Sequence, residues 1–218
     1  MRVTVQVCQN GSMPKVVDHE ERRREIAQAM WRVIARDGLA AASARTVAAE
    51  GGWSLGAVRH YFSSQDELLL FASTAMVDGV TARILAVLAG RRPGPARCQA
   101  VVEHLLPLDD ERTGEVRVWL AVLIRAHVDP TFDELRLTAW HGTRAICRLV
   151  VTELAGQPRP PDLRRPLPRR LEPRAASLHA WLDGLTLQAA TVPELLPPES
   201  VRREVRRELR RLRDAVSA

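Results

Sequence analysis

Two short segments between residues 43 and 61 hold the most specific chemical pattern in the chain. Ser43 and Ser54 each precede a few residues of helical pattern, and Gly51 and Gly52 separate the two segments. Serine is a preferred N-cap and glycine a preferred helix terminator, so the pattern predicts two short helices joined by a tight turn. Helices connected in this way form a helix-turn-helix, which reads duplex DNA by placing its second helix in the major groove.

The residue types in these segments suit contacts to bases and to phosphates. Gly56 and Ala57, at the start of the second helix, are small enough to let the backbone approach base edges. Arg45 and Arg59 carry guanidinium groups, which match the O6 and N7 acceptors of guanine. The other donors are short or rigid and suit phosphate oxygens: Ser43, Ser54, His60 and Tyr61.

Some residues of the motif also have a purely structural interpretation. Arg45 could be an ordinary surface arginine, because the chain has thirty-one arginines beside a single lysine, Lys15. Its position one turn before the glycines favours DNA contact. Phe62 is predicted to lie in the core, and Tyr61 to pack its ring there while its hydroxyl reaches a phosphate. Trp53 is expected to pack against the turn.

Composition limits the class of protein. The chain has 218 residues and a formal net charge of +6, which favours an anionic partner such as nucleic acid. Cys8, Cys98 and Cys147 are far apart and odd in number, so neither a disulfide framework nor a metal site is expected, and no cofactor is predicted. We find no apolar run of about 18–20 residues and no signal-peptide pattern, so the expected location is the cytoplasm, away from membranes.

The elements that position the motif are predicted to be helical throughout. Apolar residues recur at helical spacing over 18–37, and Ser64 to Glu67 forms a capping box at the start of a long helix that ends near Gly90. The segment 111–128 contains VWLAVLI, which is apolar nearly all round and typical of a helix in the middle of a bundle. The other predicted helices span 95–106, 130–155, 175–192 and 199–216. The predicted fold class is therefore all-α.

Three parts can be separated on this pattern. Residues 1–12 match nothing that follows and are assigned to an unstructured N-terminal extension. A three-helix, helix-turn-helix DNA-binding domain is predicted over 13–63, joined to a larger C-terminal helical bundle over 64–218. Within the bundle, residues 156–174 are rich in proline and arginine and are predicted to form a mobile loop.

The sequence over 24–69, REIAQAMWRVIARDGLAAASARTVAAEGGWSLGAVRHYFSSQDELL, resembles the DNA-binding domain of the TetR family of bacterial transcriptional repressors. The resemblance implies phosphate contacts by Ser43, Ser54, His60 and Tyr61. It implies base contacts by Arg45, Leu55, Gly56, Ala57 and Arg59. Two positions depart from the family pattern. Arg59 stands where tyrosine is usual, and Gln65 where a phosphate-binding lysine is common, a loss that softens the salt dependence of binding by about one unit of slope.

The larger domain resembles the BetI-like subgroup through VRVWLAVLIRAHVDP and LHAWLDGLTLQ. This resemblance implies that the domain binds a small-molecule effector and pairs two protomers into a homodimer. The dimer interface is expected on the apolar faces of the last two helices, with packing inside one protomer as the alternative: Leu178, Trp181, Leu182, Leu185, Val205, Leu209 and Leu212. A mostly apolar pocket is expected among the preceding helices, although each residue singly suits a core or surface role: Met76, His104, Trp119, His127, Trp140, His141 and Cys147.

The implied function is sequence-specific regulation of transcription. Two recognition helices about 34–36 Å apart would bind a palindromic double-stranded DNA operator, and an effector that favours another spacing would release it. The long helix from Ser64 to Gly90 is the predicted lever, with Gly79 as either a weak point or a packing residue. A ligand-independent or activating regulator is the alternative.

Two other classes of protein are disfavoured. We expect no dinucleotide-binding Gly-x-Gly-x-x-Gly, no phosphate loop, no Gly-x-Ser-x-Gly hydrolase motif and no His-Glu-x-x-His zinc motif, so an enzyme is not expected. The final helix has seven arginines within 202–213 beside an apolar face, a pattern compatible with anionic lipid. Four acids interrupt that basic face and favour a dimer helix with i,i+4 ion pairs: Glu199, Glu204, Glu208 and Asp214.

Overall fold

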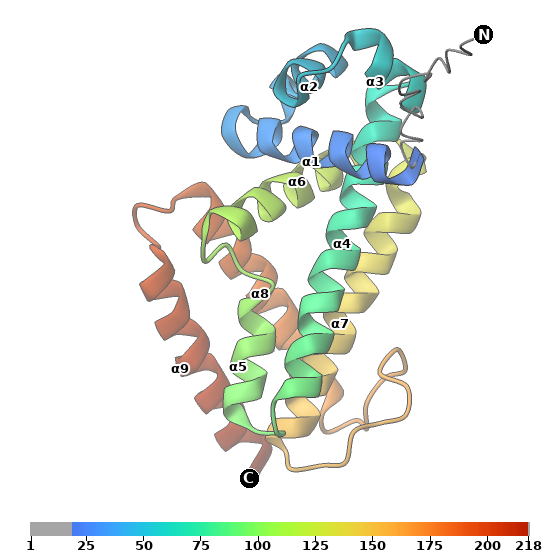
Figure 1. The fold of residues 1–218 in the computed structure, drawn as a ribbon. Helices are drawn as coiled ribbons and strands as arrows, with labels where there is room; N and C mark the ends of the chain where they lie inside the picture. Colours follow the sequence, from blue (N-terminus) through green and yellow to red (C-terminus); the bar gives the residue numbers. More distant parts are fainter. Residues whose placement is uncertain (1–18, 218) are drawn as a thin grey trace, which may run out of the picture.

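The computed structural model describes residues 19–217, and every regular element in that range is helical (Figure 1). Nine α-helices follow one another there, with 3₁₀ turns at Leu39–Ala41 and Pro130–Phe132. The predicted all-α fold is confirmed. The proposed N-terminal extension, residues 1–12, lies outside the described residues, as do residues 13–18 at the start of the predicted head.

The N-terminal head is a bundle of three helices. They are α1 (His19–Asp37), α2 (Ala44–Gly51) and α3 (Leu55–Tyr61). The apolar face predicted for the first helix is buried, with Ile26, Met30 and Val33 at most 1% exposed. Phe62, just after α3, lies in the same core, as predicted. The periodic apolar residues of α1 therefore provide the platform on which the two short helices rest.

Local capping bonds fix the two short helices. The Ser43 hydroxyl accepts the backbone N–H of Thr46 (3.2 Å), and the Thr46 hydroxyl accepts the N–H of Ser43 (2.9 Å), which makes a complete capping box. The Ser54 hydroxyl accepts the N–H of Ala57 (3.1 Å). Gly52 ends α2 at φ +71°, in the left-handed region that glycine adopts without a steric penalty. Both predicted serine caps are confirmed.

Six helices make up the body. They are α4 (Gln65–Gly90), α5 (Pro95–Glu103), α6 (Asp110–Ala126), α7 (Asp133–Leu154), α8 (Glu172–Thr191) and α9 (Pro198–Ser217). Figure 1 shows α4 running from the head to the far end of the body, with α6 crossing beneath α1. Because α4 contacts α1, α5, α6 and α7, it connects the head to the helices around it.

The start of α4 differs from the predicted capping box. The Ser64 hydroxyl accepts the N–H of Glu67 (3.0 Å), as expected of an N-cap. The Glu67 carboxylate, however, accepts the N–H of Ser63 (2.8 Å) and its hydroxyl (2.7 Å). The reciprocal half of the box is thus made to the preceding residue, because Glu67 has two serines within reach.

One expectation about membranes is wrong for α4. Within residues 19–217, it is the one helix long and apolar enough to cross a membrane by length and composition, with a mean hydropathy of 1.5 over its most apolar window. A core helix of a folded protein passes the same test, and one such helix is weak evidence for a span. In this structure α4 packs against α1 of the head and against α5, α6 and α7 of the body.

The predicted all-round burial of the sixth helix is also wrong. Val118 and Val122 are buried in the middle of α6, at 1% and 0% exposed. Near the end of the helix, Ile124 is 71% exposed, and Val128 just beyond it is 70% exposed. The sequence shows which residues of the helix are apolar, but the packing of the surrounding helices determines which of them are buried.

The proline-rich segment between α7 and α8 is anchored to the body. Arg148 of α7 is 7% exposed and donates to the backbone carbonyls of Leu163 (3.1 Å) and Arg164 (2.7 Å). The same guanidinium binds the Glu172 carboxylate at 2.7 Å, and Leu167 from the segment lies in the core. The segment therefore has fixed attachment points that its composition did not predict.

Buried apolar residues form two clusters. The first surrounds α1 and continues into the body, where it includes Met76 of α4, Val118 of α6 and Phe132 directly before α7. The second joins α5, the later part of α7, α8 and α9 through residues such as Val102 and Leu182. The core beneath the head thus extends well into the body.

Candidate DNA-binding surface and effector region

The nine residues predicted to contact DNA all lie at the surface of the head. The fully exposed ones are Arg45 on α2 and Ser54, Gly56, Arg59 and His60 on or beside α3. The partly buried ones are Ser43, Leu55, Ala57 and Tyr61. Figure 1 places α2 and α3 at the end of the molecule away from the C-terminus. The structure therefore brings these residues together on one part of the head.

Two buried side chains hold α3 in place. Val58 is 1% exposed and Phe62 is 3% exposed, and both belong to the core beneath α1. Trp53 packs beside the turn as predicted, with the Arg22 guanidinium 5.6 Å from its ring. With its inward side chains fixed in this way, α3 presents its opposite face, including Gly56 and Arg59, to solvent.

Other arginines of the head are engaged in ion pairs that connect its helices. Arg32 and Arg36 of α1 bind Glu50 of α2 at 2.8 and 2.9 Å. Hydrogen bonds from these two guanidinium groups lower the pKa of Glu50. Arg23 of α1 lies 3.6 Å from Glu67 of α4. These pairs orient α2 and α4 on α1, whereas Arg45 and Arg59 point away from the head.

Tyr61 lies where α3 meets the start of α1. Its ring centroid is 4.7 Å from that of His19 and 5.2 Å from that of His60. The ring is thus partly packed, as predicted, and the phosphate contact of its hydroxyl stays a prediction. His60 is exposed and stacks edge-on against Tyr61.

The expected absence of a hydrolase motif is wrong at the level of sequence, because the pattern occurs in this turn. Residues 52–56 read GWSLG and fit the Gly-x-Ser-x-Gly motif, in which serine stands between a strand and a helix. Here Ser54 lies between two helices, and its hydroxyl accepts the N–H of Ala57 as an N-cap. The strand that a nucleophile elbow requires is replaced by α2, so the match is one of sequence only.

The seven residues expected to form an effector pocket are not gathered around one cavity. Met76 and Trp119 belong to the core that continues from the head, whereas Cys147 is fully buried in the second core. Three others are exposed: His127, Trp140 and His141. His104 alone lines a depression, which has a volume of about 410 Å³ and lies between α4 and the end of α5.

Arginines dominate the polar lining of that depression. Arg83 of α4 and Arg91, just beyond the end of that helix, line it beside His104. The pKa of His104 is lowered, first by burial and then by the positive charges of Arg112, Arg83 and Arg91. Both lining arginines were missed by the sequence reasoning, because nothing distinguishes them there from the other arginines of the chain.

Arg83 also connects α4 to α6. It donates to both carboxylate oxygens of Glu115, at 2.6 and 2.7 Å. Burial raises the pKa of Glu115, although the hydrogen bond from Arg83 acts against this. Two positions along α6, Arg117 donates to the backbone carbonyl of Ala35 near the end of α1. The helix is thus bonded to both the long helix and the head.

Most of the residues predicted at the dimer interface are buried within the protomer. Trp181 is partly exposed, and the other six are at most 8% exposed: Leu178, Leu182, Leu185, Val205, Leu209 and Leu212. On the outer surface, Leu187 of α8 is 50% exposed. A depression of about 280 Å³ beside it is lined by Trp181, Gly184 and Gln188 of α8 and by Glu204 of α9, among others.

A buried histidine between α7 and α8 was also missed. His179 is 3% exposed, its Nδ1 accepts a hydrogen bond from Arg144 Nε (3.2 Å), and its Nε2 lies 3.6 Å from Asp183. Burial lowers the pKa of His179, so the neutral form that can accept from Arg144 is favoured. Trp140 joins this group, because Arg144 lies 5.0 Å from its ring centroid.

Comparison with known proteins supports the same interpretation of the chain. Residues 94–214 match the family model of the C-terminal domain of BetI-type transcriptional repressors. The HTH-type transcriptional regulator PksA of Bacillus subtilis is 36% identical over 195 residues, which cover 88% of this chain and 90% of that protein. BetI of Paraburkholderia phymatum is 30% identical, covering 82% of this chain and 86% of that protein.

Solved structures give a matching result. A transcriptional regulator from Rhodococcus sp. Rha1 superimposes with a TM-score of 0.74 at 33% identity, covering 90% of this chain and 98% of that one. A regulator from Saccharomonospora viridis, solved in complex with choline, has a TM-score of 0.70 at 25% identity and covers 85% of this chain and 94% of its own. Together with the exposed helix-turn-helix and the helical body, these matches show that the chain is a transcriptional regulator of the TetR family with a BetI-type C-terminal domain.

Proposed function

We propose that the protein is a homodimeric repressor that binds a palindromic operator and leaves it when a small-molecule effector binds. The observation that carries this proposal is the exposed face of α3, where Gly56 and Arg59 point away from a core that holds Val58 and Phe62. An outward-facing recognition helix on a rigid head is what insertion into the major groove requires. The expected location of the protein is the cytoplasm, where operator DNA is accessible.

The proposed contacts divide into base and phosphate contacts. Arg45, Leu55, Gly56, Ala57 and Arg59 are assigned to bases. The phosphate contacts are assigned to Ser43, Ser54, His60 and Tyr61. The two serines accept backbone N–H groups as N-caps. The Ser54 hydroxyl keeps its proton to donate to a phosphate oxygen, whereas the Ser43 hydroxyl lies 3.1 Å from that of Thr46 and would exchange this contact for the phosphate. Capping and DNA binding are therefore compatible at the same side chain.

Homodimerisation is proposed through the outer surfaces of α8 and α9. Six of the apolar residues first considered for this role are buried within the protomer, so the proposed contact uses the outer face of α8. This face carries Trp181, Gly184, Leu187 and Gln188. The exposed side of α9 is charged and carries ion pairs within the helix, such as Arg207–Glu204 and Arg211–Glu208. A charged rim around a small apolar centre is typical of protein interfaces.

Repression with release by a ligand is favoured over ligand-independent or activating regulation for two reasons. The family model matched by the C-terminal domain is that of a repressor. The body also has a direct route to the head, because α6 bonds to α4 through Glu115 and to α1 through Arg117. A ligand that moves α4 or α6 would therefore change the position of the head and the spacing of the two recognition helices.

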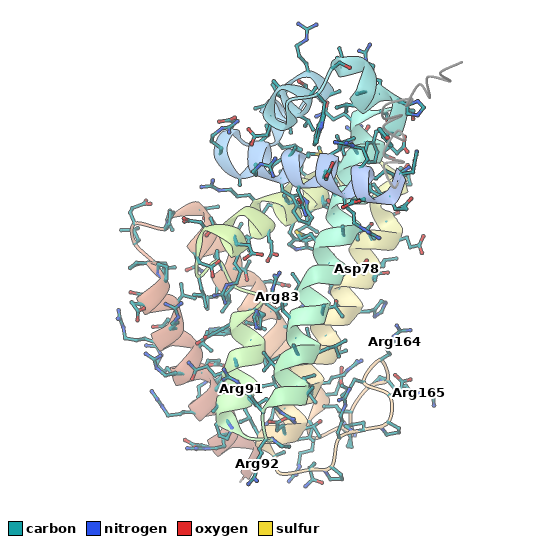
Figure 2. The ribbon with its side chains drawn as sticks, in the orientation of Figure 1. Asp78, Arg83, Arg91, Arg92, Arg164 and Arg165 are labelled. Atoms are coloured by element: carbon teal, nitrogen blue, oxygen red, sulfur yellow. The ribbon has the colours of Figure 1, made fainter. Side chains whose placement is uncertain are left out.

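Selection of duplex DNA by the purified protein, followed by sequencing, tests this function. We expect the wild type to enrich a palindrome, and the Arg45→Ala/Tyr61→Ala variant to lose the enrichment, because each base or phosphate contact contributes about 1–3 kcal/mol. Arg92→Ala is the matched control, since Arg92 is exposed at the end of α4 far from the head (Figure 2). Enrichment that survives the double substitution, or no enrichment by the wild type at low salt, would contradict the proposal.

A further inference from the structure

The depression between α4 and α5 combines an apolar floor with cationic groups. Arg83 and Val87 lie four residues apart on one face of α4, and Arg91 follows as the C-cap, where the backbone is extended. Ala86 contributes to the floor between them, and His104 closes the side toward α5. Figure 2 labels Arg83 in the body and Arg91 farther from the head. A ligand with an apolar portion and a charged end would match this surface.

The charge of the lining selects an anion. Arg91 is exposed at the rim, and the positive charges of Arg112, Arg83 and Arg91 act on His104 in the direction that disfavours a second cation there, although the neighbouring Glu103 acts against them. The opposing charge of Glu115 is already engaged by Arg83, and Glu111 lies 3.6 Å from the same guanidinium but is largely exposed. Guanidinium groups bind carboxylates and phosphates by two parallel hydrogen bonds.

The lining does not suit a quaternary ammonium ligand. Such cations are bound over the faces of aromatic rings. The six residues that line this depression in the described part of the chain include no phenylalanine, tyrosine or tryptophan. The choline seen with the Saccharomonospora viridis regulator is therefore a poor model for a ligand at this place.

We propose that the depression binds a small anion with an apolar portion, such as a medium-chain carboxylate or alkyl phosphate, and that Arg83 exchanges Glu115 for this ligand. The inference rests on the proposed function, because it gives the chemical class of the effector. Glu115 is 16% exposed at its side chain, so its carboxylate loses a counterion in a partly buried place when Arg83 leaves. The neighbouring Gly114 packs on Ala35 of α1, with only 3.1 Å between that methyl group and an ideal Cβ at Gly114. Movement of α6 at this point therefore reaches the head.

Calorimetric titration with four probes tests the ligand class on the intact protein. Octanoate and octyl phosphate should bind. Choline, which is a cation, and octanol, which is uncharged, should bind at least tenfold more weakly. Arg91→Gln should weaken octanoate binding about tenfold, and the adjacent, exposed Arg92→Gln should leave it unchanged. Equal binding of octanoate and octanol, or equal effects of the two arginine substitutions, would overturn the assignment.

A third variant gives a change of opposite sign. Glu115→Gln removes the carboxylate that competes for Arg83, so it should tighten octanoate binding by several-fold, a gain that simple damage to the fold would not produce. Unchanged or weaker binding by this variant would refute the exchange.

Operator binding separates this inference from the proposed function. Wild-type protein should lose affinity for the selected operator about tenfold when saturated with octanoate, and Arg91→Gln should lose much less at the same concentration. If the unliganded protein binds no operator, the proposed function fails while the calorimetric result still decides the ligand class. If operator and octanoate both bind without affecting one another, the link from Arg83 to the head is refuted.

Discussion

Two glycines of the helix-turn-helix are needed for different reasons. An ideal Cβ on Gly51 would lie 2.1 Å from Cζ3 of the Trp53 ring, a distance no real contact has. At Gly56 the nearest atom would be the Ser54 hydroxyl oxygen, at an ordinary 3.8 Å. The fold of the turn thus requires Gly51, whereas nothing within the described head requires Gly56. A small residue at position 56 suits the close approach of DNA that we propose for this face.

Substitution by alanine should therefore affect stability at position 51 and operator binding at position 56. We expect Gly51→Ala to destabilise the protein by about 1–3 kcal/mol, because the indole ring must shift. Gly56→Ala should leave the free energy of unfolding unchanged or slightly raised but weaken operator binding about tenfold, since the methyl group lies at the protein–DNA contact. Denaturant unfolding and DNA titration measure the two quantities. Full operator affinity in Gly56→Ala would mean that α3 does not approach DNA by this face.

Residue types predicted the local features of the site better than its long-range partners. The Ser43 and Ser54 caps could be identified from sequence because an N-cap bonds to a backbone group three residues away. Arg83 and Glu115 are 32 positions apart in the chain, and they pair only because α4 and α6 pack together in the fold. In a chain so rich in arginine, a functional guanidinium carries no compositional signal.

At the level of elements, α4 is a continuous helix from Gln65 to Gly90 despite the glycine at position 79. An ideal Cβ at Gly79 would meet only the Arg83 Nη1 atom, at 3.8 Å. The glycine is therefore neither a break in the helix nor a forced close contact, and its cost is the lower helix propensity of glycine.

Stiffening α4 tests whether it moves as a rigid lever. Gly79→Ala should raise the stability by about 0.5–1 kcal/mol, seen as a melting temperature about 1–4 °C higher, because alanine favours the helix and fits the space. If α4 moves as one body, operator affinity and its loss with ligand should stay as in the wild type. An alanine variant that binds operator but no longer responds to octanoate would show instead that α4 bends at this residue.

The periodic pattern of a helix indicates its buried face but not the identity of its partner. The apolar faces of α8 and α9 were predicted from spacing, and they are buried, yet they pack within the protomer. The end of α6 shows the converse, since Ile124 is apolar but exposed. Helix positions could thus be predicted from local sequence, whereas the assignment of faces to core, pocket or interface depends on contacts distant in the chain.

At the scale of the whole molecule, the proposed dimer presents two heads to one operator. Its contact must come from side chains that the protomer leaves exposed. Leu187 of α8 meets that condition, because it is half exposed and lies one turn from the depression lined by Gly184 and Gln188.

A charge at this position should separate the protomers without unfolding them. We expect Leu187→Asp to weaken dimerisation by at least about tenfold, since an apolar contact near the centre of an interface typically contributes more than 1 kcal/mol. Analytical ultracentrifugation over a concentration series measures the dissociation constant. Leu85→Asp, on the exposed face of α4, is the matched control and should remain dimeric. A dimer unaffected by the Leu187 substitution would place the contact elsewhere.

The core that continues from α1 into α4, α6 and the start of α7 bears on how this protein can be taken apart or recombined. Cutting the chain between residues 63 and 64 would separate the core residues of α1, such as Met30, from Met76, Val118 and Phe132. Both fragments would then expose apolar surface. Chimaeras with other regulators should therefore exchange the head together with the upper halves of these helices. The unit that folds together is larger than the unit that reads DNA.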